Sequence, residues 1–140
     1  MFYKVSFKTA MSLSVIVLSA PYSSQSAYTA YRYVKAALES GHTVTRVFFY
    51  QDAVHAASKL ATPPQDEFDL YEAWQTLQAK FTLDIVVCIA AAARRGLINQ
   101  AESKRHNKTA DNIADNFEVS GLGQLVEACV TSDKTITFGA

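Results

Sequence analysis

The chain has 140 residues, a length that fits one domain with a sizeable core. Thirteen basic residues balance thirteen acidic ones, which disfavours a general nucleic-acid binder because phosphate contacts need an excess of Lys and Arg. Two cysteines are too few for a disulfide scaffold, so we expect free thiols and a reducing, cytoplasmic environment.

The N-terminal segment is expected to differ from the rest of the chain. Residues 1–12 are expected to form a disordered extension, and residues 13–140 the folded domain. Met11 could be the true start, which would leave residues 1–10 as a disordered or misassigned extension. The apolar run Leu13–Leu18 is much too short to span a membrane, and its β-branched residues are typical of a strand covered on both faces.

A helix and a second strand are predicted after this first strand. Ser19–Ser24 interrupts the apolar run, apolar residues then recur at helical spacing as far as Leu38, and Gly41 is expected to close the helix. Thr43–Tyr50 has the apolar bulk of a strand. Because a strand–helix–strand unit makes a right-handed crossover, we predict an α/β fold, a single three-layer domain with a central, mainly parallel β-sheet flanked by helices.

The middle of the chain predicts further helices and a third strand. A short helix is expected over Gln51–Lys59, followed by a loop at Thr62–Pro64. Acidic residues between positions 66 and 69 are expected to open the next helix, as the helix dipole favours. Leu83–Ile89 is the predicted third strand. The buried stripe of the helix before it is expected to consist of Leu70, Trp74, Leu77 and Phe81.

The C-terminal part begins with a polar segment. Asn99–Asn116 is predicted to be an exposed, partly helical excursion, anchored mainly by Ile113 and Phe117. Ser120–Gly123 is expected to form a turn, and Lys134–Phe138 a last short strand. The closing helix between them is predicted to bury one face, which makes Cys129 structural. That face comprises Leu122, Leu125, Val126 and Cys129.

Cys88 is the candidate catalytic residue. From the pattern alone, packing in a core strand is the commoner role of such a cysteine. Chemistry is favoured because the thiol lies near the carboxyl end of a strand, where open α/β sheets bind their ligands. The run Ala90–Ala93 can begin a helix whose N-terminal dipole favours an anion, and Arg94 and Arg95 could add positive charge. These features together would favour a nucleophilic thiolate.

Other chemistries find little support. His42 is expected to be a turn residue, His55 to have an ordinary surface or packing role, and His106 to face solvent. No pair of His or Cys has metal-ligand spacing. Gly121-Leu-Gly123 lacks the third glycine of the dinucleotide fingerprint, and no Gly-x-Ser-x-Gly elbow occurs. We therefore expect no metal site and no cofactor.

Several segments together carry a family resemblance. Residues 88–96 read Cys-x-Ala-Ala-Ala-x-Arg-Arg-Gly, a motif that is specific in this context. The chain resembles the TusD group of the DsrE-like sulfurtransferase family from about Ser14 to Phe138. The first ten residues have no counterpart in the family, and Cys129 does not map onto a family function. Besides the cysteine motif, the matching segments are Phe48–Tyr50, Ser58–Leu60, Asp66–Leu70 with Trp74, and Ser120–Leu125.

The resemblance implies a function as well as a DsrE-like fold. Cys88 would match the sulfur-accepting cysteine of the family, which carries a persulfide. The expected partners are TusB-like and TusC-like subunits in a heterohexamer, a TusA-like sulfur donor and a TusE-like acceptor, without stable nucleic-acid binding. The sulfur would be destined for 2-thiouridine at the tRNA wobble position. Two alternatives remain open: a DsrE-type carrier in dissimilatory sulfur oxidation, and a structural subunit in which Cys88 is inert.

Overall fold

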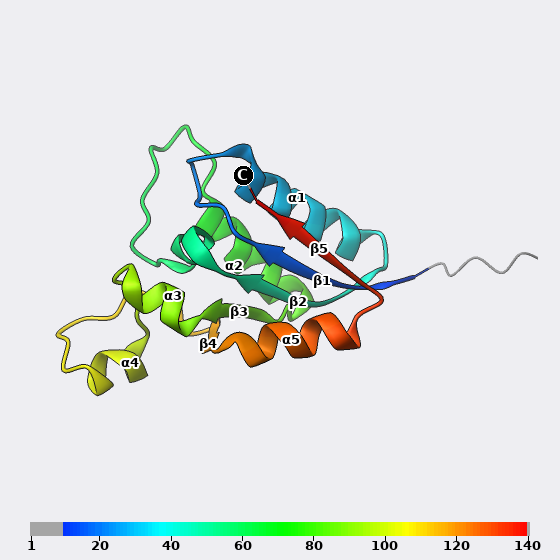
Figure 1. Cartoon of the computed structure of the whole chain (residues 1–140). Helices are drawn as coiled ribbons and strands as arrows, with labels where there is room; N and C mark the ends of the chain where they lie inside the picture. Colours follow the sequence, from blue (N-terminus) through cyan, green and yellow to red (C-terminus); the bar gives the residue numbers. More distant parts are fainter. Residues whose placement is uncertain (1–9, 140) are drawn as a thin grey trace, which may run out of the picture.

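A five-stranded parallel sheet forms the centre of the part of the chain that the computed structural model describes, residues 10–139 (Figure 1). Its strands lie in the order β4-β3-β2-β1-β5, and each neighbouring pair is parallel. The predicted α/β fold is thereby confirmed. The strands are β1 (Ser12–Val17), β2 (Thr43–Phe49), β3 (Ile85–Cys88), β4 (Glu118–Ser120) and β5 (Lys134–Phe138).

The strand boundaries follow the predictions with three differences. β1 begins at Ser12, inside the expected extension, whereas residues 1–9 of that extension lie outside the described residues. β3 is shorter than the predicted Leu83–Ile89, because the chain passes into a helix directly after Cys88. β4 has no counterpart among the predicted elements. It adds an edge strand beside β3.

Two helices cover one face of the sheet (Figure 1). They are α1 (Gln25–Glu39) and α2 (Leu70–Phe81). Trp74 of α2 packs edge-on against Phe49 of β2, with the ring centroids 5.3 Å apart. Of the stripe predicted for α2, the first three members are buried and Phe81 is half-buried. None of the helices in the described part of the chain has the length and apolar character that a membrane crossing requires.

The opposite face of the sheet carries α5 (Leu122–Thr131) (Figure 1). This contact is partly polar. The Ser14 hydroxyl on β1 donates to the carbonyl of Ala128 over 2.9 Å, and the Arg46 guanidinium on β2 donates to the carbonyl of Gln124 over 2.8 Å. These bonds turn the small side chain of Ala128 toward the sheet, where it is buried.

The orientation of α5 corrects the prediction for its apolar face. Leu122, Val126 and Cys129 point into solvent, so Cys129 is not a buried structural residue. Val126 is 61% exposed and Val130 is 78% exposed. Leu125 is half-buried against the core. The helix therefore presents an apolar row outward, because the sheet beneath it offers hydrogen-bonding groups.

Helix ends follow two expectations from the sequence. Gly41 comes just after the end of α1 with a φ of +87°, a left-handed conformation that glycine adopts without steric cost. Asp69 is the N-cap of α2, and its carboxylate accepts a hydrogen bond from the backbone of Glu72 at 3.0 Å. The acidic residues at positions 66 and 67 precede the helix instead of opening it.

Asp69→Ala is expected to lower the free energy of unfolding by about 1 kcal/mol, because a backbone N–H of α2 then loses its side-chain acceptor. The matched control is Ser24→Ala at the N-cap of α1, where the side chain makes no capping bond. That control should change stability less than Asp69→Ala does. Urea denaturation of both variants measures the difference, and equal losses would contradict the assignment.

The polar excursion predicted for Asn99–Asn116 contains α4 (Gln100–Arg105). Its predicted anchors are confirmed, since Ile113 and Phe117 are both buried. Asn112 ties the two ends of the excursion together, because its side-chain oxygen accepts from the backbone N–H of Ile98 at 2.9 Å. The excursion is therefore fixed to the domain at its base.

Candidate active site

Cys88 ends β3 and is also the N-cap of α3 (Ile89–Arg94), so the strand passes into the helix without a loop. β3 lies between β2 and the three-residue β4, with Cys88 opposite Ser120 in the register. The residue is 2% exposed. The thiol therefore lies where the sequence predicts it, at the carboxyl end of a buried strand and the start of a helix, and its catalytic role stays a prediction.

The helix after Cys88 is made of small residues. Ala91 and Ala92 are buried, and α3 packs against η1 (Gln51–Ala57), the 3₁₀ helix that follows β2. Alanines permit this close approach because they have no side-chain atoms beyond Cβ. The predicted short helix over Gln51–Lys59 is thus confirmed, and it supports the helix that begins at the thiol.

Arg95 links α3 to η1. Its Nε donates to the carboxylate of Asp52 over 2.7 Å, and a terminal nitrogen donates to the carbonyl of Ala91 over 3.0 Å. Gly96 follows with a φ of +75°, which allows the chain to turn away. Arg94 is exposed and has no ion pair or side-chain hydrogen bond with any described residue. Arg95 therefore holds α3 against η1 through its bond to Asp52. Sequence spacing does not reveal this contact, because Asp52 lies 43 residues away.

The histidines occupy the kinds of position that were expected. His42 accepts a hydrogen bond from the backbone N–H of Met11 at 3.1 Å. His55 lies exposed on η1, at a pocket of about 440 Å³ that Asp52 also lines. His106 is exposed and lies 3.2 Å from the carboxylate of Glu102. Within the described residues, no three His, Cys, Asp or Glu side chains form a group that could hold a metal ion.

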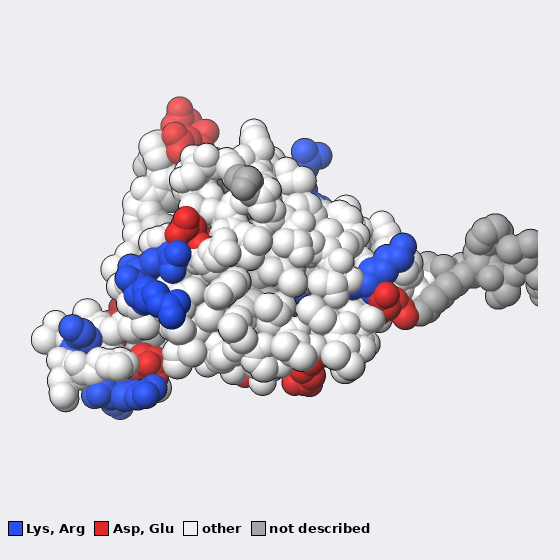
Figure 2. Space-filling view, viewed as in Figure 1, with Lys and Arg blue, Asp and Glu red and all other residues white. Residues whose placement is uncertain are grey.

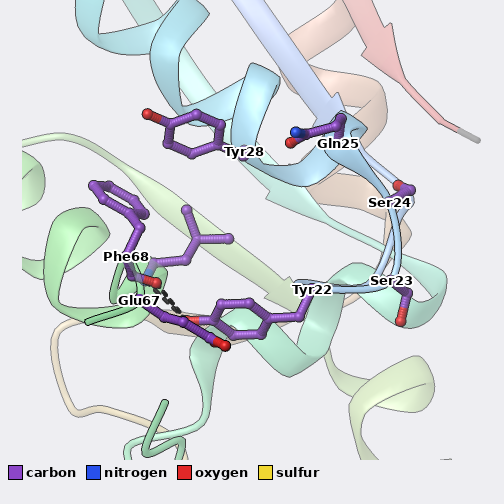
Figure 3. A pocket seen from close by; sticks show the side chains of 8 residues that line it. Tyr22, Ser23, Ser24, Gln25, Tyr28, Glu67 and Phe68 are labelled. Carbon is purple, nitrogen blue, oxygen red and sulfur yellow. Dashed lines mark hydrogen bonds between the residues drawn. The ribbon is translucent and has the colours of Figure 1, made fainter. Parts of the chain in front are cut away.

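A second pocket, of about 600 Å³, lies where α1 begins (Figure 3). Tyr28 and Phe68 form one side of it, with ring centroids 4.9 Å apart in an edge-on arrangement. The Tyr22 hydroxyl donates to the carbonyl of Phe68 over 3.0 Å and thereby fixes the loop before α2. Cys88 is not among the residues that line this pocket. The pocket is therefore a feature of the loops around α1 and is separate from the thiol.

The two thiols differ in their exposure, and this gives a testable expectation. Cys129 should react with a small alkylating reagent at least about a hundredfold faster than Cys88, because access to a buried thiol requires a local opening of the fold. The rates are measured by mass spectrometry of peptides after timed quenching. In guanidinium the two rates should become similar. Equal rates in the folded chain would contradict the buried position of Cys88.

Comparison with known proteins decides the family. The model of the DsrE/DsrF-like family matches residues 11–138. The chain belongs to this family. It is 45% identical to the DsrE protein of Allochromatium vinosum over 129 residues, which cover 92% of this chain and 99% of the relative. It is 48% identical to the sulfurtransferase TusD homologue of Pseudomonas aeruginosa over 124 residues, which cover 89% and 95%.

A solved structure gives the same fold. The ychN protein of E. coli superposes with a TM-score of 0.74 at 23% sequence identity, covering 91% of this chain and 98% of that protein. The predicted family, the predicted fold and sulfur transfer as the general activity are thus confirmed. The comparisons leave the role of Cys88 as a prediction.

Proposed function

We propose that this chain is a sulfurtransferase subunit that accepts sulfur as a persulfide on Cys88 and relays it to a partner protein, for 2-thiolation of the tRNA wobble uridine. The position of the thiol carries the proposal. Cys88 ends a buried strand and begins α3 within the Cys-x-Ala-Ala-Ala-x-Arg-Arg-Gly motif, in a chain whose relatives are named sulfurtransferases.

The proposed chemistry is exchange at a sulfur atom. The Cys88 thiolate attacks the outer sulfur of a donor persulfide, the donor S–S bond breaks, and the donor leaves as a thiolate. An acceptor thiolate then attacks the outer sulfur on Cys88, and the Cys88 thiolate leaves in turn. Each step forms one S–S bond and breaks another, so the transfer needs no oxidant, reductant or cofactor.

Burial of Cys88 suits a sulfur carrier, because an enclosed persulfide is protected from water and from stray thiols. Sulfur must still reach the site. The edge strand that pairs with the end of β3 at Cys88, β4, has three residues, and short edge elements open locally at low cost in free energy. We expect the donor and acceptor to approach the thiol from this edge.

The proposed partners are TusB-like and TusC-like subunits in a heterohexamer, a TusA-like donor and a TusE-like acceptor. Exposed apolar side chains on α5 support assembly, because a continuous apolar patch on a monomer commonly marks a protein interface. These are Leu122, Val126 and Val130. The proposal places the protein in the cytoplasm, where tRNA and reduced thiols occur together, and involves no stable contact of this chain with nucleic acid.

Two other functions have a specific observation in their favour. The DsrE relative at 45% identity favours a sulfur carrier in dissimilatory sulfur oxidation, which would use the same thiol and a different acceptor. The 2% exposure of Cys88 favours a structural subunit with an inert cysteine. The sulfur-oxidation alternative is distinguished from tRNA thiolation by the genes that neighbour the coding gene and by the partner proteins captured from the native host. Sulfur loading distinguishes the second.

The direct test is to incubate the folded chain with a sulfur donor and measure its mass. We expect an addition of about 32 mass units, carried by the peptide that contains Cys88 and removed by a reductant. A chain that takes up no sulfur with its partner subunits present would overturn the proposal in favour of the structural role.

A further inference from the structure

Cationic side chains gather at the end of the molecule formed by α3 and α4, where Figure 2 shows Lys and Arg over both helices. We call this the basic surface. It consists of Arg94, Lys104, Arg105 and Lys108, all of which are exposed. Three of them, all except Arg105, have no ion pair or side-chain hydrogen bond with any described residue. The chain as a whole is neutral, so this local excess of positive charge is a distinct feature.

The basic surface adjoins a pocket of about 610 Å³. Ala93 and Gly96, on either side of the two arginines, line one part of the pocket, and Lys108 lines another. The pocket is held open by hydrogen bonds. The side-chain nitrogen of Asn112 donates to the carbonyl of Gly96 over 2.9 Å, and the same side chain accepts from the backbone N–H of Ile98. Of the four cations, Lys108 therefore lines the pocket itself, and Arg94 directly follows the lining residue Ala93 in the chain.

The carboxylates close to the basic surface are already engaged. Asp111 accepts a hydrogen bond from Lys59, which raises the pKa of that lysine. Glu102 is largely buried and lies within 3.3 Å of both Arg105 and His106. Neither carboxylate neutralises the three free cations, so the surface presents a positive charge that an acidic partner can complement.

We propose that the basic surface docks an acidic polypeptide segment of the proteins that exchange sulfur with Cys88, an inference that rests on the proposed function. α3 has six residues and spans about 9 Å, so a segment held near Arg94 lies within about one helix length of the thiol. Docking there brings the partner's cysteine close to Cys88. It also gives a role to the three cations that have no partner among the described residues.

An acidic polypeptide fits the surface better than a nucleic acid does. Proteins that bind nucleic acid strongly commonly make about six to ten phosphate contacts, whereas the basic surface has three cations without a partner among the described residues. The reaction at Cys88 also requires a protein thiol as donor or acceptor. We therefore assign the surface to proteins.

The test uses two dye-labelled peptides of equal length, one rich in Glu and one rich in Lys, each carrying one Ser in place of Cys. Their binding to the full chain is followed by fluorescence anisotropy at low and high salt. We expect the Glu-rich peptide to bind more tightly than the Lys-rich peptide, and high salt to weaken its binding.

Lys104→Gln with Lys108→Gln should weaken binding of the Glu-rich peptide by about tenfold, because two charge-assisted contacts are lost. Lys35→Gln with Lys134→Gln is the matched control, which removes two exposed lysines elsewhere and should change binding less than about twofold.

Circular dichroism checks that each variant keeps its fold. Equal weakening by the two pairs of substitutions would overturn the inference, since net charge alone would then explain the binding. An RNA oligonucleotide that binds more tightly than the Glu-rich peptide, and that responds to Lys104 and Lys108 alone, would overturn it in favour of nucleic acid. Failure of the proposed function is distinguishable, because sulfur loading of Cys88 is measured separately by mass.

Discussion

Cys88→Ser is expected to abolish sulfur loading, whereas Cys129→Ser is expected to leave it unchanged. Serine keeps nearly the size of cysteine but cannot form the S–S bond that holds the transferred sulfur. The loss should therefore be complete and visible as the absence of the addition of about 32 mass units. Cys129 provides the matched control because it is also a free thiol, and it lies exposed on α5, on an element that does not contain the motif.

Cys88→Ala is a second variant that separates loss of the thiol from loss of the fold. A serine hydroxyl at this buried position could lack a hydrogen-bond partner, at a cost of about 1–3 kcal/mol, and alanine avoids that cost. Both variants should fold and both should fail to load. An addition that persists in Cys88→Ala and disappears in Cys129→Ser would assign the carrier to α5 and would contradict the proposed role of Cys88.

The sheet could be predicted because its inner strands have a strong pattern of their own. β3 is apolar throughout, and β1 and β2 each end in three consecutive apolar residues, as is typical of strands covered on both faces. α1 between β1 and β2 indicates a parallel crossover. β4 could not be found in this way. Glu118–Ser120 is exposed or half-buried and is a strand because it pairs with β3, through contacts that its own sequence does not show.

The direction in which α5 faces depends on residues elsewhere in the chain. Helical spacing groups Leu122, Val126 and Cys129, and a face of that kind usually packs on a core. The sheet beneath offers Ser14 and Arg46 instead, and their bonds to backbone carbonyls of α5 turn the apolar row outward. The same row is a candidate for contact with another subunit, so the wrong prediction of burial points to an interface.

The position of the thiol in the candidate site could be predicted from the sequence, whereas the contacts of the residues around it could not. The strand-to-helix transition at Cys88 follows from local sequence, since an apolar run gives way to a run of alanines. The bond between Arg95 and Asp52 depends on how η1 packs against α3, which no local pattern specifies. Sequence therefore locates the candidate thiol, and the fold determines which nearby charged side chains are paired.

Trp74→Ala is expected to lower the free energy of unfolding by about 3–5 kcal/mol, the range for a large aromatic residue removed from a core. Trp74 is 1% exposed, and its ring packs edge-on against Phe49 and Tyr31 with centroids 5.3 Å away in each case. It therefore joins α1, α2 and β2. Since single domains are stable by about 5–15 kcal/mol, this one substitution removes a large share of the total.

The matched control is Phe68→Ala, which removes an aromatic ring from the same neighbourhood. Phe68 also packs against Tyr31, but it is 45% exposed, so its loss should cost less than about 1.5 kcal/mol. Because Trp74 is the only tryptophan, unfolding in urea is best followed by far-ultraviolet circular dichroism in all variants. Trp74→Phe, which keeps a ring at this position, should lie between the other two. Equal effects of Trp74→Ala and Phe68→Ala would show that the contact between α2 and the sheet is not the centre of the core.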